Sequence, residues 1–398
     1  MSVPVAPSDP AAPAPYVMTV PEAVLTSIRR RLAEYPWDSL PDAGGWRCGT
    51  DKRFLRTVVD YWHDHYDWRE QERRLNRWPQ YTVAIDGVPL RFYHVRGAHP
   101  GRALLLSHGW PGSAFEFLNL IGPLVHPERY GGAVSDSFDV VIPCLPGFGF
   151  SGPPPAPLGP RAIARLFNRL MTEVLGYQHY IAQGGDWGGA ISGWLGHDHA
   201  PACRAVHLNM VLVRAAGAPQ GEEEIAWVEQ ARRSRFAEGG YSHQQGSRPQ
   251  TLAFAMHDSP VGVAAWILEK FAAWSDLPLD EQGAPDLLAR YSLDDLITNI
   301  MFYVATGSFA SAAWIYYAFF TEERSGSFPA GSRCEVPTAV ASFPDPTFPP
   351  PPKSFVERGY NLAQWHIMPR GGHFAAMEAP QLLLEDLRTF GRYLDRIV

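Results

Sequence analysis

The chain of 398 residues is predicted to adopt an α/β fold with a mostly parallel central sheet, a helical insertion and a helical N-terminal extension. Three observations lead to this prediction. Short apolar runs alternate with helix-like runs between residues 102 and 209, which is typical of parallel strands joined by helices. The segment 214–322 breaks this alternation and is rich in helix-like runs. Strand-like runs return from residue 337 onward.

The first part of the chain lies outside this alternating pattern. Residues 1–17 are rich in Pro and Ala and lack the basic start and hydrophobic stretch of a signal peptide, so we expect a disordered lead-in. Residues 18–78 are expected to form a mainly helical extension that lies against the core and the insertion. Strands are predicted at 81–85 and 89–95, joined by a tight turn at Asp86-Gly87.

The remaining strands and the insertion define the domain organisation. Core strands are expected at 102–107, 140–145, 179–183, 204–209, 337–342 and 362–368. A helical apolar spacing over 381–394 closes the chain. We therefore divide the chain into a first core part (79–213), a helical cap (214–322) and a second core part (323–398).

The most informative segment is Gly184–Gly189, Gly-Gly-Asp-Trp-Gly-Gly. It follows a strand-like run at 180–183 and precedes a helix-like run at 190–195, the layout of a sharp elbow that presents one side chain above the sheet. That side chain is Asp186. A carboxylate is already ionised at neutral pH and can attack an electrophilic carbon to form an ester. An Asp after a strand is also a common helix N-cap, so this motif alone leaves a structural role open.

A second motif is Leu104–Ser113, Leu-Leu-Leu-Ser-His-Gly-Trp-Pro-Gly-Ser. A short apolar strand ends there in a turn-rich loop. In folds with a nucleophile elbow, this loop supplies one backbone N–H of an oxyanion hole, and the residue after the nucleophile supplies the other. We expect Trp110 and Trp187 to be these donors, which would stabilise the charge that forms when an ester is hydrolysed. An ordinary Gly/Pro turn is the alternative.

A third motif, Arg370–Glu378, contains Gly-Gly-His-Phe-Ala-Ala and follows the last predicted strand. The order nucleophile, acid, histidine along the chain is that of hydrolases with an elbow, which singles out His373. A histidine of near-neutral pKa can activate a water molecule. The chain has 14 histidines and most histidines are structural, so this assignment depends on the three motifs together.

These three motifs resemble those of the microsomal-type epoxide hydrolases, a family with the α/β-hydrolase fold. The resemblance runs from about residue 18 to the end of the chain. It implies a soluble bacterial member that converts a bulky or aryl epoxide to a vicinal diol through an aspartyl ester. Further segments that resemble the family lie in the extension and the cap, at 62–69, 75–76, 258–262, 267–271 and 292–296.

The resemblance also implies two cap tyrosines that hydrogen-bond the epoxide oxygen while the ring opens. Local similarity selects Tyr241, in Gly-Gly-Tyr-Ser-His-Gln, and Tyr316, in Ala-Trp-Ile-Tyr-Tyr, with Tyr317 as an alternative to the latter. Phenols keep their protons at neutral pH. The cap also contains many Trp and Phe residues, among them Trp274, which either fill its core or line a pocket. The implied reaction needs no metal and no organic cofactor.

An acid that orients His373 is expected just after the strand predicted at 337–342. Asp345 is the only carboxylate in that loop, and we assign this role to it. The family places its acid one position later, where this chain has Pro346. A shifted register in the Pro-rich stretch that follows, or an acid from the loop after Asn209, therefore stays open.

Composition and charge exclude several classes of protein. A net charge of −7 and the lack of a Lys/Arg patch argue against nucleic-acid binding. The four cysteines have no CxxC spacing, which fits reduced thiols in a cytoplasmic protein: Cys48, Cys144, Cys203 and Cys334. No apolar run reaches the roughly 18 residues that span a bilayer. We expect a small epoxide and water as partners, no nucleic acid and no membrane, and we leave a homodimer open.

Other functions remain as alternatives. A haloalkane dehalogenase also uses an elbow Asp followed by Trp, but it needs a halide-binding donor in place of the tyrosines and usually lacks a long N-terminal extension. A hydrolase-fold binding protein would hold a ligand without turnover, and the displaced acid keeps that alternative open. The Ala/Arg/Pro-rich composition suggests a high-GC bacterium, where soluble relatives act in catabolism or in natural-product pathways such as enediyne antibiotic assembly.

Overall fold

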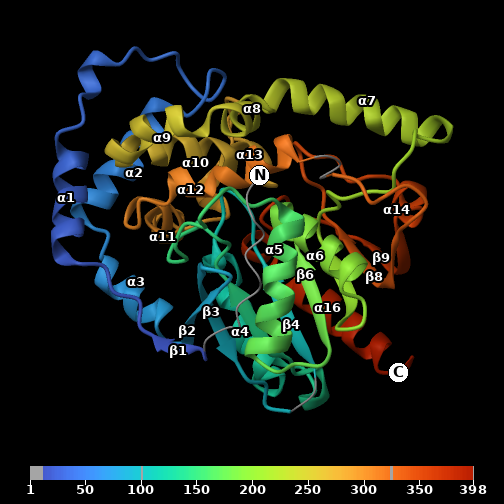
Figure 1. The fold of residues 1–398 in the computed structure, drawn as a ribbon. Coiled ribbons are helices and arrows are strands. Elements are labelled where there is room, and N and C mark those ends of the chain that lie inside the picture. The colour runs from blue at the N-terminus through green and yellow to red at the C-terminus, as the bar shows by residue number, and fades with distance from the viewer. Residues whose placement is uncertain (1–11, 100–101, 323–325, 398) are drawn as a thin grey trace, which may run out of the picture.

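The core of the fold is a twisted sheet, which lies in the lower half of Figure 1. The computed structural model describes residues 12–99, 102–322 and 326–397. The strand order across the sheet is β1-β2-β3-β5-β4-β6-β7-β8-β9. Pairing is antiparallel from β1 to β5 and parallel from β5 to β9. The strands are β1 Ala14–Tyr16, β2 Gln80–Ile85, β3 Val88–Val95, β4 Ala103–Ser107, β5 Asp139–Pro143, β6 Tyr180–Gly184, β7 Cys203–Leu208, β8 Cys334–Ser342 and β9 Tyr360–Ile367.

Helices cover both faces of the sheet and one of its ends. The α-helices are α1 Glu22–Ala33, α2 Lys52–Asp64, α3 Trp68–Leu75, α4 Leu118–Val125, α5 Pro160–Arg169, α6 Asp186–Asp198, α7 Gly221–Glu238, α8 Gly240–Ser247, α9 Pro249–Asp258, α10 Pro260–Trp274, α11 Leu293–Val304, α12 Phe309–Ala312, α13 Trp314–Thr321, α14 Lys353–Glu357, α15 Ala375–Glu378 and α16 Pro380–Leu394. Short 3₁₀ turns are η1 Trp37–Ser39, η2 Ala114–Phe117, η3 Pro127–Tyr130, η4 Val134–Asp136 and η6 Leu287–Ala289, and η5 Leu170–Val174 is a π-helical turn.

The central strands form where the sequence has continuous apolar runs. Every residue of β4, β5 and β6 is buried. This is the pattern of parallel strands that are covered by helices on both faces. The observed strands overlap all of the predicted ones, and the α/β-hydrolase fold class is confirmed.

The N-terminal lead-in differs from the expectation. Residues 1–11 lie outside the described residues, but Ala14–Tyr16 forms β1, which pairs antiparallel with β2 over Gln80 to Thr82. The prediction of disorder through residue 17 is therefore wrong for this stretch. The edge of β2 offers unpaired backbone groups, and β1 satisfies them.

The helices α7 to α13 lie between β7 and β8 in the chain and above the sheet in Figure 1. We refer to α7–α13 as the cap. The strands β4 and β6 end beneath it, so the loops that follow them face the cap. Side chains from this end of the sheet contact cap side chains, as in the ring stacking of Trp110 on Tyr241.

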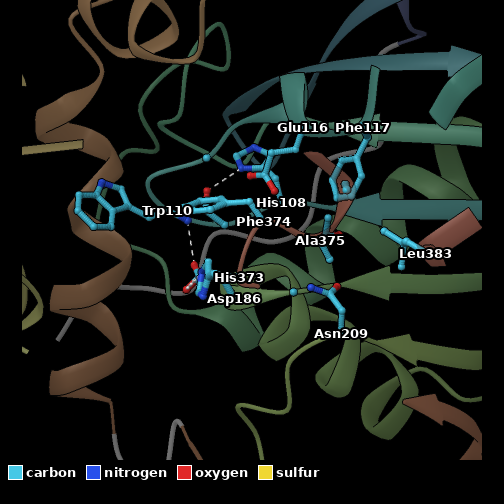
Figure 2. A pocket seen from close by; sticks show the side chains of 15 residues that line it. His108, Trp110, Glu116, Phe117, Asp186, Asn209, His373, Phe374, Ala375 and Leu383 are labelled. Carbon is cyan, nitrogen blue, oxygen red and sulfur yellow. Dashed lines mark hydrogen bonds and ion pairs between the residues drawn. The ribbon is translucent and has the colours of Figure 1, made fainter. Parts of the chain in front are cut away.

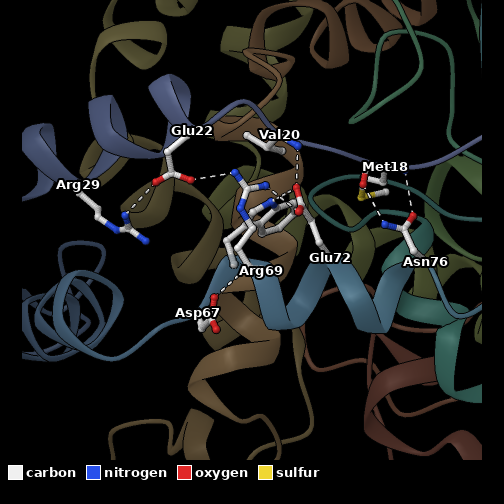
Figure 3. A network of polar contacts seen from close by, with 9 residues as sticks. Met18, Val20, Glu22, Arg29, Asp67, Arg69, Glu72 and Asn76 are labelled. Carbon is white, nitrogen blue, oxygen red and sulfur yellow. Dashed lines mark hydrogen bonds and ion pairs between the residues drawn. The ribbon is translucent and has the colours of Figure 1, made fainter.

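The helices α1 to α3 lie along one side of the molecule, against both the core and the cap (Figure 1). Within this N-terminal region, the buried carboxylate of Glu72 joins the segment before α1 to helix α3 (Figure 3). It accepts hydrogen bonds from the Val20 N–H (2.6 Å) and the Trp68 indole N–H (2.7 Å) and pairs with Arg69 (2.7 Å). The segment before α1 is thereby tied to α3.

Two side-chain contacts join this N-terminal region to cap helix α11. Arg74 pairs with Asp295 at 2.7 Å, and the hydroxyls of Tyr66 and Thr298 lie 2.9 Å apart. The Tyr66–Thr298 pair is buried. The N-terminal helices therefore support the cap from the side opposite the sheet edge at β9.

The cysteines Cys48, Cys144, Cys203 and Cys334 are free thiols. Within the described part of the chain, no single helix is both long and apolar enough to cross a membrane. A pair of helices, Leu293–Val304 and Phe309–Thr321, meets that criterion only when taken together, and it is bent by 89°.

Candidate active site

The elbow begins where β6 ends and presents Asp186 as the first residue of α6. Asp186 has φ of +46°, a left-handed conformation that is rare for residues other than glycine. The neighbouring glycines are sterically required. A Cβ at Gly188 would overlap the Ser107 carbonyl oxygen, and one at Gly184 would overlap the Gly188 backbone. The Gly-rich motif thus allows the sharp turn that lifts Asp186 above the sheet.

The two carboxylate oxygens of Asp186 have different surroundings (Figure 2). Oδ1 accepts a hydrogen bond from the backbone N–H of Trp110 at 2.8 Å. Oδ2 lies 3.5 Å from Nε2 of His373. The predicted loop donor Trp110 therefore holds one oxygen, while the other faces the histidine.

Asp345 lies on the far side of the imidazole ring. Its Oδ2 is 2.8 Å from Nδ1 of His373. Its Oδ1 accepts hydrogen bonds from the backbone N–H groups of Thr347 (2.8 Å) and Phe348 (2.7 Å). The loop after β8 thus fixes the carboxylate that we assigned from the sequence, despite its position one residue before the family pattern.

The charge of His373 follows from these neighbours. Burial disfavours the imidazolium, but the interactions of the ring with the carboxylates of Asp186 and Asp345 outweigh it and raise the pKa of His373 to about 10. At neutral pH the ring is therefore a cation between two carboxylates.

A further carboxylate, Glu378, holds the loop that carries His373. It is buried and accepts hydrogen bonds from the N–H groups of Gly372 (2.9 Å), Phe374 (2.8 Å) and Asp276 (2.7 Å). Burial raises the pKa of Glu378 to about 7, although these N–H groups act in the opposite direction. The sequence showed a Glu in the motif, but its spacing did not reveal that it points back at its own loop.

The two predicted tyrosines lie together in the cap. Tyr241 comes from α8 and Tyr316 from α13, and their ring centroids are 5.8 Å apart. The Trp110 ring stacks on Tyr241 at 4.9 Å and meets Tyr316 edge-on at 5.8 Å. Tyr317, in contrast, is 39% exposed. The structure therefore brings Tyr316, and not Tyr317, to the elbow.

Both phenols keep their protons. Burial, the largest cause for each, raises the pKa values of Tyr241 and Tyr316 well above the usual value, and the charge of Asp186 raises them further. A protonated phenol can donate a hydrogen bond to an oxygen on which negative charge develops.

Trp187 contributes both its backbone and its ring. As the second residue of α6 it has a backbone N–H without an acceptor inside the helix. Its ring meets Tyr316 edge-on at 4.7 Å and Phe319 at 5.0 Å. The backbone N–H of Trp187 is therefore placed as expected for a second oxyanion donor, while the ring of Trp187 contacts the cap.

Cap helix α11 forms hydrogen bonds with the loop that carries Trp110, and the sequence did not reveal this contact. Asn299 donates to the Pro111 carbonyl at 2.8 Å and accepts from the Ser113 hydroxyl at 2.8 Å. Tyr303 donates to the Gly112 carbonyl at 2.6 Å. These bonds fix the loop from the cap side, next to the N–H that Trp110 presents to Asp186.

His108 supports the same loop from beneath. Burial lowers the pKa of His108 to about 4, so the ring is neutral. Its Nε2 accepts a hydrogen bond from the Leu145 N–H at 3.1 Å, and Nδ1 lies 3.0 Å from the Gly109 carbonyl. The motif histidine is therefore structural.

Trp274 is the cap aromatic that belongs to the site. Its carbonyl accepts a hydrogen bond from the backbone N–H of His373 at 3.0 Å, and its ring lies 4.7 Å from the imidazole and 5.1 Å from the ring of Tyr241. In the part of the chain that the structure describes, no group of three or more His, Cys, Asp or Glu side chains could hold a metal ion.

The chain matches two family models. Residues 13–117 match the model described as epoxide hydrolase N terminus, and residues 102–380 match the α/β hydrolase fold. A protein of Stigmatella aurantiaca (strain DW4/3-1), named "Putative epoxide hydrolase", is 39% identical over 96% of this chain and 85% of its own length. Epoxide hydrolase 1 of Oryctolagus cuniculus is 34% identical over 87% and 82%. The crystal structure of juvenile hormone epoxide hydrolase from the silkworm Bombyx mori superposes with a TM-score of 0.84 at 28% identity, over 96% of each chain.

Proposed function

The chain belongs to the epoxide hydrolase family, and from this premise we propose that it converts a bulky or aryl epoxide to a vicinal diol through an ester on Asp186. The observation that carries the proposal is the setting of Asp186. One of its oxygens is held by a backbone N–H, the other is free beside His373, and two buried phenols lie within the same group of rings.

In the first step, Oδ2 of Asp186 attacks an epoxide carbon while Oδ1 stays bound to the Trp110 N–H. The ring C–O bond breaks and its electron pair goes to the epoxide oxygen. Tyr241 and Tyr316 donate hydrogen bonds to that oxygen as its charge grows. This assignment is supported by the burial of both phenols, because a donor in a dry site stabilises developing charge more than one in water.

Ester formation changes the charge of the site. Asp186 is one of the two carboxylates that raise the pKa of His373, and the ester carries no charge. The pKa of His373 therefore falls at this stage. The imidazolium can then give its proton to the alkoxide, directly or through a phenol, and become a neutral base.

In the second step, His373 takes a proton from a water molecule that attacks Cγ of the ester. The N–H groups of Trp110 and Trp187 stabilise the oxyanion. The bond between Cγ and the substrate oxygen then breaks, and that oxygen takes the remaining proton of the former water. The diol leaves, Asp186 is again a carboxylate and His373 again a cation, so the cycle is balanced.

A bulky or aryl substrate is supported by the aromatic character of the site. The rings of Trp110, Trp187, Trp274 and Phe319 surround the tyrosines and the histidine. Such surfaces bind large apolar groups and aromatic rings more strongly than small polar ones.

Trapping of the ester tests this function. With styrene oxide, His373→Gln should form the ester but not hydrolyse it, so the intact protein mass should increase by the mass of one epoxide. Asp186→Ala should give neither the adduct nor the diol. Tyr317→Phe is the control, because Tyr317 is partly exposed and outside the site. Release of bromide from a bromoalkane without any diol from epoxides would contradict the proposal and favour a dehalogenase.

A further inference from the structure

A small cavity, with room for about one water molecule, adjoins Asp186 and His373 on the core side of the site (Figure 2). Its walls come from the loop after β4, the elbow, the end of β7 and the histidine loop. Neither Tyr241 nor Tyr316 lines it. The cavity thus touches the two reacting groups from a different side than the phenols. Its lining includes Glu116, Phe117, Asn209 and Leu383.

Glu116 is the acidic side chain that enters this cavity beside Asp186. It belongs to η2 and folds back under the loop after β4, where a Cβ at Gly112 would overlap its Oε1 atom. The glycine at position 112 therefore provides the space that the Glu116 carboxyl group occupies.

The Glu116 carboxyl group has no cationic partner. None of the ion pairs formed by the described residues includes it, although His373 is close enough to affect its titration. Burial raises the pKa of Glu116 to about 8, and the charge of Asp186 acts in the same direction. A polar group that is half-buried, largely neutral and open to a cavity is suited to hold water.

His373 offers a second group to the same cavity. Its Nε2 is buried and forms no hydrogen bond with the described residues, since Asp186 Oδ2 lies 3.5 Å away. A water molecule in the cavity could donate one hydrogen bond to Nε2 once the ring is neutral, and the other to an oxygen of Glu116. With both protons donated, the lone pairs of the water oxygen would stay available for attack on Cγ.

We propose that this cavity holds the hydrolytic water and that Glu116 orients it for attack on the Asp186 ester. This inference rests on the proposed function. The water oxygen forms a bond to Cγ, and His373 takes one proton at Nε2. Glu116 accepts a hydrogen bond throughout and exchanges no proton. With the epoxide on the side of the tyrosines, the cavity is the space beside Cγ that the substrate leaves free.

Rapid-quench measurements with styrene oxide can separate the two chemical steps, because the intact mass of the quenched protein reports the ester. In Glu116→Ala we expect ester formation within about 3-fold of the wild type and ester hydrolysis slower by about 10- to 100-fold, as for the loss of one positioned polar group in catalysis. The ester should therefore accumulate.

Two further variants test the position of the carboxyl group. Glu116→Gln keeps a carbonyl oxygen in place and should recover most of the hydrolysis rate. Gly112→Ala leaves Glu116 in the sequence but displaces its carboxyl group, so it should resemble Glu116→Ala. Thermal unfolding of each variant reports any loss of folding. If Glu116→Ala is unstable, the two single variants Glu116→Gln and Gly112→Ala still test the proposal.

The inference is wrong if the ester decays in Glu116→Ala at the wild-type rate, or if both steps slow equally. These results differ from a failure of the proposed function itself. In that case the wild-type protein and His373→Gln would show no ester at all.

Discussion

Asp186 and His373 control each other through charge. Two carboxylates keep the imidazole ring protonated, and a reaction that neutralises one of them converts the ring from a cation to a base. The raised pKa keeps the ring protonated at neutral pH, and the cation is lost as the pH rises through about 10. In the proposed mechanism, the histidine would thus become a base once the ester has formed, when a base is needed.

Removal of the Asp186 charge should reproduce this change without substrate. In Asp186→Asn, the pKa of His373 should fall below its wild-type value of about 10, because one of the two neighbouring carboxylates is lost. A pH titration of the ring by NMR with labelled histidine measures this directly. An unchanged pKa in the variant would show that Asp345 alone sets the charge.

The two cap phenols should act on ring opening and not on ester hydrolysis. Tyr241→Phe and Tyr316→Phe should each slow ester formation by about 10²- to 10³-fold, the usual effect of one donor in an electrostatic site. Tyr317→Phe should leave it unchanged, since that side chain is 39% exposed. Single-turnover kinetics with styrene oxide compare the three variants. Equal effects of Tyr316 and Tyr317 would contradict the assignment.

The sequence could predict Asp186 and His373 because their motifs fix a turn and a chain order. It could not separate Tyr316 from Tyr317, because the surrounding run Trp-Ile-Tyr-Tyr-Ala-Phe-Phe is apolar on every side of a helix. Only packing against Trp110 and Trp187 selects one face. The role of Glu378 was hidden for a similar reason, since it depends on the path of its own loop.

At the scale of elements, helix α11 and the loop after β4 form one unit. Asn299 and Tyr303 lie one helical turn apart and donate to consecutive carbonyls of the loop. The cap therefore holds the Trp110 N–H in place as well as covering the elbow. A helical pattern in the sequence predicts α11, but not the partners of its polar residues.

The bond from Asn299 should affect stability and hydrolysis together. Asn299→Ala leaves the buried Pro111 carbonyl without a donor, which costs about 1–3 kcal/mol. We expect a lower Tm and a slower hydrolysis of the ester, because the Trp110 donor is less well placed. Thermal unfolding and rapid-quench kinetics measure the two effects. A lower Tm with unchanged hydrolysis would show that the loop does not depend on α11.

The strand β1 shows what a local pattern cannot predict. The sequence Ala-Pro-Tyr has neither the alternation nor the β-branched residues of a strand. It pairs because β2 presents an open edge, which is a property of the folded sheet. The strands β4 and β6, in contrast, can be predicted from the apolar runs in their sequences.

Over the whole molecule, the N-terminal helices connect the core to the cap. Glu72 ties the incoming chain to α3, while Tyr66 and Arg74 reach helix α11. The cap is therefore supported from two directions, by the loop beneath it and by the N-terminal helices at its side. The sequence predicted such an extension, and its contacts follow only from the fold.

Glu72→Ala should weaken this connection. The Val20 N–H and the buried Trp68 indole N–H would lose their acceptor, and each unsatisfied group costs about 1–3 kcal/mol. We expect a Tm lower by several degrees, with the rate of ester hydrolysis in the remaining folded protein close to that of the wild type. Glu70→Ala, a change on the same helix, is the matched control. A loss of activity without a loss of stability would contradict a purely structural role.

The central claim is that a carboxylate, and not water, first attacks the epoxide. One turnover of styrene oxide in ¹⁸O-water, with enzyme in excess, tests it most directly by mass spectrometry of the diol and of the peptide that contains Asp186. A diol without label, together with one ¹⁸O atom in the Asp186 carboxylate, is the predicted result. A first diol that carries ¹⁸O, with an unlabelled Asp186, would show direct attack by water and contradict the ester mechanism.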